Sequence, residues 1–149
     1  MTNPEPNQQR FEKYYPLTYA ILITVASVVL CLWFTAVPKL SETILSSGIT
    51  AAAIFIGFNA VYRNTLQAKA SRTIEELKAS EEMVDYLRYL KAVTNSALLF
   101  ILVSFILLFL PKAALEHILT FNVWLFFAVN MLLSFHRANN LDNLLFASK

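Results

Sequence analysis

Four long blocks of apolar residues alternate with polar segments along the chain. The blocks cover residues 17–37, 44–62, 93–110 and 118–135, and none contains an Asp, Glu, Lys or Arg. A helix needs about 20 mostly apolar residues to cross the roughly 30 Å hydrocarbon core of a bilayer. The pattern therefore predicts an all-α membrane protein with four transmembrane helices, folded as one membrane domain over residues 1–149.

The Lys and Arg residues predict how the chain crosses the membrane. Ten of them fall in residues 1–16, 63–92 and 136–149, whereas the other two connections hold only Lys39 and Lys112. Cytoplasmic loops carry an excess of basic residues, so both short tails and the middle connection are expected in the cytoplasm. We predict a multi-pass protein of the cell inner (plasma) membrane. The Tyr and Trp residues near the block ends agree with this orientation.

The middle connection, residues 63–92, is rich in helix-forming residues and has no Gly or Pro. The second and third transmembrane helices should therefore extend into the cytoplasm and form a helical hairpin. Ser80, followed by two glutamates, resembles a helix start, and Thr73 with an acid three residues later is a competing one. We favour a reversal near residues 78–80, which makes the two arms similar in length.

Charge is ordered along this hairpin, with basic residues toward the membrane and acids toward the tip. The acidic set is Glu75, Glu76, Glu81, Glu82 and Asp85. Basic residues next to anionic headgroups are electrostatically favourable. The acidic set is either a solvated tip or a docking surface for a basic cytoplasmic protein partner.

Small and mildly polar side chains follow one another on a single face of the second block, at alternating steps of four and three residues. They form the small-residue stripe: Ser46, Thr50, Ala53, Gly57, Ala60 and Asn64. Helices in lipid associate through close backbone packing and interhelical hydrogen bonds, which small residues permit. The stripe predicts either packing within one chain or a homo-oligomer in which it lines a pore. Because both glycines of the chain, Gly48 and Gly57, lie in this block, helix contact should be decided here.

Composition and missing motifs exclude several function classes. The chain is 57% hydrophobic with a mean hydropathy of +0.54, and its net charge of +2 is spread out, so we expect no nucleic-acid partner. A single cysteine, Cys31, rules out an internal disulfide and is expected to pack. The chain has no glycine-rich phosphate loop and no nucleophile elbow, so we predict that it is not an enzyme. Proton-coupled transport is disfavoured because no charged residue lies inside a block.

The remaining polar residues have structural interpretations. Asn59, Asn122 and Asn130 are expected to form interhelical hydrogen bonds. His117 and His136 lie at opposite ends of the last block without suitable partners, so neither a metal nor another cofactor is expected. Residues 111–117 predict either a short helix opened by proline or a plain turn.

Three features together give the chain a recognisable layout: its four spans, a Leu45-Ser46-Ser47 entry to a small-residue second span, and a charged cytoplasmic helical connection. This layout resembles the RexB family of phage-exclusion membrane proteins. The resemblance implies a membrane effector that conducts ions or depolarises the inner membrane when a cytoplasmic partner signals infection.

Three functional hypotheses follow. The first is an oligomeric membrane effector that perturbs the membrane or conducts ions. It is triggered through its cytoplasmic hairpin. The second is a non-conducting adaptor or subunit that recruits a cytoplasmic partner. The third class comprises a small transporter, a lipid-modifying enzyme or a component of a larger membrane complex.

Overall fold

The computed structural model describes residues 6–34, 38–68 and 81–146. Every element in these residues is a helix: α1 (Pro6–Phe34), α2 (Glu42–Ala68), α4 (Glu81–Leu108), α5 (Lys112–Leu115) and α6 (Ile118–Phe146). Four of them contain stretches long and apolar enough to cross a membrane, namely Tyr14–Phe34, Glu42–Val61, Leu87–Leu108 and Ile118–Asn140. The predicted all-α fold with four potential membrane spans is confirmed.

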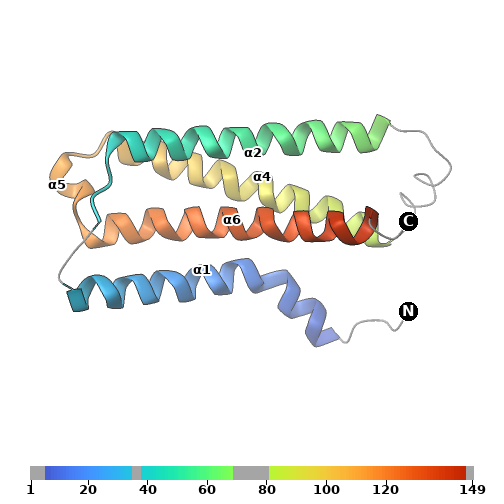
Figure 1. Ribbon diagram of the computed structural model, residues 1–149, viewed down its shortest axis with the longest axis horizontal. Helices are drawn as coiled ribbons and strands as arrows, with labels where there is room; N and C mark the ends of the chain where they lie inside the picture. The colour runs from blue at the N-terminus through green and yellow to red at the C-terminus, as the bar shows by residue number, and fades with distance from the viewer. Residues whose placement is uncertain (1–5, 35–37, 69–80, 147–149) are drawn as a thin grey trace.

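Each long helix runs antiparallel to the long helix that precedes it in the chain (Figure 1). The start of α1 and the end of α6 lie at one end of the molecule, which we call the terminal end. The end of α2 and the start of α4 lie there too, and α5 lies at the opposite end, which we call the α5 end. Because the four long helices alternate in direction, both ends of the described chain lie at the same end of the bundle.

The four long helices pack side by side in the order α2, α4, α6, α1, so α1 lies at one edge. α4 packs against both α2 and α6, whereas the main contact of α1 is with α6 (Figure 1). Most apolar side chains of α1 therefore face outward, and Trp33 is 81% exposed. Lipid tails are as apolar as these side chains, so such exposure is expected of a helix in a bilayer.

Two apolar clusters hold α2, α4 and α6 together. The first lies toward the α5 end and contains Leu40, Leu45, Leu107 and Leu115. The second lies in the middle of the bundle and contains Ala52, Ala97, Phe100 and Met131. Trp124 contacts both clusters, and its ring lies 5.5 Å from that of Phe100.

Local sequence signals explain where the helices begin and bend. The Ser41 hydroxyl accepts a hydrogen bond from the Ile44 amide at 3.2 Å, which caps the start of α2. Pro16 lies inside α1, where it removes a backbone hydrogen bond, and α1 bends in its amino-terminal part (Figure 1). The segment before α6 forms one short helix, α5, with Pro111 at its N-cap position. The short-helix alternative for this segment is therefore correct.

Two helices extend beyond their candidate spans toward the predicted hairpin. α2 continues beyond its candidate span to Ala68, and α4 starts at Glu81, before its own span begins. Ser80, the favoured helix start, is not among the described residues. Residues 69–80, which include Thr73 and the expected reversal, lie outside the described residues.

α1 is longer at its start than the first apolar block suggested. The helix begins at Pro6, within the segment that the sequence analysis assigned to an amino-terminal tail, and the described part ends at Phe34. The tyrosine hydroxyl of Tyr15, near the start of its candidate span, donates a hydrogen bond to the Leu133 carbonyl at 3.2 Å. This bond fixes the beginning of the α1 span against α6.

Candidate functional site

The small-residue stripe lies on the outer surface of α2. All six of its side chains (Ser46, Thr50, Ala53, Gly57, Ala60 and Asn64) are exposed. The side of α2 that packs against α4 and α6 is instead formed by Leu45, Ala52 and Asn59, which are buried. The stripe therefore faces away from the other helices of its own chain.

The two glycines of α2 lie on these opposite faces. A Cβ atom added to Gly48 would meet the Phe100 Cζ atom at 3.0 Å and the Trp124 Cζ2 atom at 3.4 Å. A Cβ atom added to Gly57 would meet nothing within 4 Å. Gly48 therefore permits close packing within the chain, whereas the space beside Gly57 is open.

The hydroxyl groups of the stripe bond to their own helix. Ser46 Oγ donates to the Thr43 carbonyl at 3.1 Å, and Thr50 Oγ1 donates to the Ser46 carbonyl at 3.0 Å. Such bonds satisfy hydroxyl donors in an apolar medium. This face can consequently meet lipid or another helix without leaving these hydroxyl donors unbonded.

The acidic set is only partly placed. Glu75 and Glu76 lie outside the described residues, and Glu81, Glu82 and Asp85 lie in the first two turns of α4. Their side chains are not among those that the structure describes. The three α4 positions lie before the Leu87 start of the candidate span, at the terminal end.

Two of the three asparagines confirm the expected interhelical bonds. Asn59 Nδ2 on α2 donates to the Leu90 carbonyl of α4 at 3.1 Å, and Asn130 Nδ2 on α6 donates to Ser96 Oγ of α4 at 3.3 Å. For Asn122 the expectation is wrong, because its Nδ2 bonds to the Ile118 carbonyl of the same helix. Residue 122 lies one turn into α6, where that carbonyl is within reach.

The sequence analysis did not identify Arg137 as a residue that packs within the helix bundle. The sequence analysis placed it in the carboxyl-terminal tail, but the fourth candidate span extends to Asn140 and includes it. Its side chain is half-buried, and the guanidinium carbon lies 3.6 Å from the centre of the Tyr89 ring on α4. The candidate spans also include Glu42, Arg88 and Lys91, so the expectation that no charged residue lies inside a span is wrong at four positions near the span ends. No local motif indicates the Arg137 contact, because the ring comes from a distant part of the chain.

Trp124 also differs in its surroundings from an interfacial residue. Its indole Nε1 donates to Ser104 Oγ of α4 at 3.1 Å, and Ser104 is fully buried. The side chain thus packs from α6 against α4, while Trp33 keeps the exposure expected of an interface residue.

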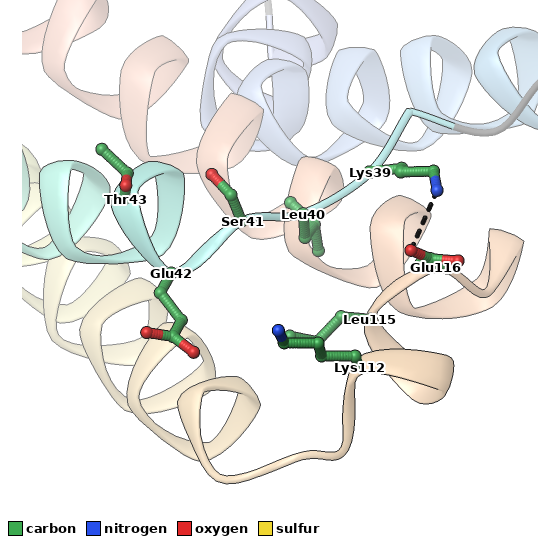
Figure 2. Close-up of a pocket in the computed structure, with 8 residues that line it drawn as sticks. All are labelled: Lys39, Leu40, Ser41, Glu42, Thr43, Lys112, Leu115 and Glu116. Carbon is green, nitrogen blue, oxygen red and sulfur yellow. Dashed lines mark hydrogen bonds and ion pairs between the residues drawn. The ribbon is translucent and has the colours of Figure 1, made fainter.

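An open cleft of about 430 Å³ lies at the α5 end (Figure 2). One wall is the segment that leads into α2, and the other is formed by α5 and the residue after it. Lys39 Nζ and Glu116 Oε1, both exposed, form an ion pair at 3.0 Å across it. The cleft also holds Glu42 and Lys112, so two cations balance two anions and no one charge is favoured.

Both histidines lie within hydrogen-bonding distance of groups of α6. His117 Nδ1 accepts a hydrogen bond from the Leu119 amide, and His136 Nε2 lies 3.0 Å from Asn140 Nδ2. The described residues contain no group of three or more His, Cys, Asp or Glu side chains placed to hold a metal ion. Comparisons with protein-family models, with curated proteins and with solved structures gave no match.

Proposed function

We propose that the protein is an effector of the cell inner membrane, oriented with both ends of the chain in the cytoplasm. Copies of it associate through the small-residue stripe of α2, and the assembly perturbs the membrane or conducts ions. The cytoplasmic hairpin supplies the trigger. The layout shared with phage-exclusion membrane proteins suggests a role in phage defence.

The observation that supports this proposal is the exposure of the stripe. Small residues on a lipid-facing surface leave a shallow groove, and the open space at Gly57 lets a second helix backbone approach closely. Because the stripe faces away from α4 and α6, one chain alone cannot enclose it. A pore lined by Ser46, Thr50 and Asn64 therefore requires several copies.

The test compares Gly57→Leu with Ala51→Leu in the full chain, purified and inserted into nanodiscs. Both positions are exposed on α2, but Ala51 lies outside the stripe. We expect the wild type and Ala51→Leu to form the same oligomer and to pass ions in liposomes. Gly57→Leu should shift the protein toward the monomer and reduce ion flux by about tenfold, since added bulk blocks close backbone approach.

Two results would contradict the proposal. A monomeric wild type would exclude a shared axial pore. An oligomer and an ion flux that both survive Gly57→Leu would show that the stripe is not the contact.

The alternative is a non-conducting adaptor, and the extension of α2 and α4 beyond their spans favours it. A helical arm at the terminal end gives a cytoplasmic partner a surface on which to dock. Neutralising the five residues of the acidic set should then abolish co-purification of a partner while the oligomeric state stays unchanged. Unchanged co-purification would remove the adaptor hypothesis, and ion flux without any partner would favour the effector.

A further inference from the structure

We propose that a cleft at the terminal end of the bundle binds the headgroup of an anionic phospholipid, with Arg137 holding the phosphate. The cleft has a volume of about 170 Å³ and is lined by three helices. Pro16 and Leu17 of α1 form one side, and Tyr89 and Ser96 of α4 form the other. Because α1 and α4 each pack mainly against α6, α6 forms the floor between them.

The geometry of Arg137 suits an anion. Its guanidinium group stacks over the Tyr89 ring, with the carbon atom 3.6 Å from the ring centre. A cation–π contact uses the flat face of the guanidinium, whereas its N–H donors project from the edge in the fork that binds phosphate oxygens in pairs. Tyr89 therefore fixes the orientation of the group that would hold the phosphate.

The polar side chains of the cleft lie at successive depths along α6, in the same order as the phosphate and ester oxygens of a phospholipid. Arg137 lies three residues before the Asn140 end of the candidate span, about 5 Å along the helix axis, which is close to the headgroup layer. Ser134 and Asn130 follow about 5 and 10 Å deeper on α6. Ser96 Oγ lies 3.3 Å from both Ser134 Oγ and Asn130 Nδ2. This polar cluster lies where the glycerol and ester oxygens of a lipid follow its phosphate.

The surroundings of the cleft add positive charge and an apolar path. Lys91 is exposed in the second turn of the α4 span, at the same end as Arg137. Basic pockets between transmembrane helices are typical binding sites for anionic headgroups. On α1, Leu17 and, one turn deeper, Ile21 are 44% and 48% exposed and offer a surface for an acyl chain.

A bound lipid would also attach α1 more firmly to the bundle. α1 has its main contact with α6, so an occupant that touches both walls of the cleft joins α1 to α4. A ligand that binds only the folded state raises the temperature of unfolding. Binding can therefore be measured as stabilisation, independently of any ion flux.

The experiment uses the full chain purified in an uncharged detergent. The unfolding temperature is measured during titration with short-chain phosphatidylglycerol, with phosphatidylcholine of the same chain length, and with inorganic phosphate. Native mass spectrometry counts the lipids that remain bound. We expect phosphatidylglycerol alone to raise the unfolding temperature and to stay bound at one per chain.

The matched variants are Arg137→Gln and Arg88→Gln, which remove one guanidinium each at the same end. Loss of a charge-assisted bond to phosphate should weaken phosphatidylglycerol binding about tenfold in Arg137→Gln. Arg88→Gln should change it by less than about twofold, because an exposed charge outside the cleft contributes only screened attraction. Circular dichroism checks that both variants are folded.

Three outcomes would overturn the proposal. Equal stabilisation by phosphatidylcholine would show that the headgroup charge is not recognised. Equal stabilisation by inorganic phosphate would show a site for a free anion rather than a lipid. Unchanged binding in folded Arg137→Gln would show that the lipid lies elsewhere, and if that variant does not fold, unchanged binding in Ser134→Ala would overturn the proposal in its place.

Discussion

The two faces of α2 have similar residue types but opposite surroundings. One face, with Gly48, Phe55 and Asn59, packs against α4 and α6. The other face, with Gly57 and Asn64, is exposed. A glycine and an amide thus occur on both faces, and only the first pair contacts other helices of the chain. In a membrane helix, therefore, residue type alone does not reveal which face forms the interior.

The largest contrast is expected between the two glycines. Gly48→Leu should destabilise the folded chain by about 3 kcal/mol, the upper range for overpacking, because its Cβ alone would press on the Phe100 ring. Gly57→Leu should leave the stability of the single chain unchanged or slightly higher, since leucine favours helix more than glycine does. Reversible unfolding in detergent, under conditions that keep the chain monomeric, measures both. Equal losses in the two variants would refute the assignment of the faces.

A second contrast involves two phenylalanines of α2. The Phe55 ring stacks on Phe135 of α6 with 4.5 Å between ring centres, whereas Phe58 is 67% exposed. Phe55→Ala should cost about 2 kcal/mol, less than for a fully buried ring because Phe55 is only half-buried. Phe58→Ala should cost less than about 0.5 kcal/mol, as at other positions without packing partners. A Phe58→Ala loss as large as that of Phe55→Ala would mean that the exposed face is covered in the detergent-solubilised protein.

The smallest contrast is between two asparagines. Asn59→Leu removes the bonds that join α2 to Leu90 and Thr94 of α4, at 3.1 and 3.3 Å, and should cost about 1 kcal/mol. Asn64→Leu, on the exposed stripe, should be neutral in the monomer. The same unfolding assay applies, and Thr94→Val combined with Asn59→Leu shows whether the two residues are coupled. Additive losses would indicate that the hydrogen bond between them contributes little.

Hydropathy and charge were sufficient to predict the number of long helices and their antiparallel course. Each of the four blocks is long enough and apolar enough to cross a membrane as a helix. Helix ends were also predictable where a local signal exists. α5 forms directly after Pro111, as the short-helix alternative predicted.

Packing faces were not predictable from the same pattern. In water the apolar face of a helix turns inward, but in lipid both faces are apolar, so periodicity does not distinguish them. The sequence identified the residues of the stripe but not whether they face the other helices or the surface. That became clear only from Phe100 and Trp124, which lie beside Gly48 on the opposite face of α2. Arg137 was missed for a related reason. Its neighbour Tyr89 is on another helix, and a basic residue at the end of a span resembles an ordinary cytoplasmic flank.

The pairing of α1 with α6 has a consequence for how the protein is made. α1 leaves the ribosome before α2 and α4, whereas α6, against which it mainly packs, follows them. At typical synthesis rates α1 must wait on the order of ten seconds in the membrane before α6 arrives. During that interval α1 is surrounded by lipid or by the insertion machinery, and a chain truncated before α6 never provides its partner. α1 is thus made well before the helix that completes its packing.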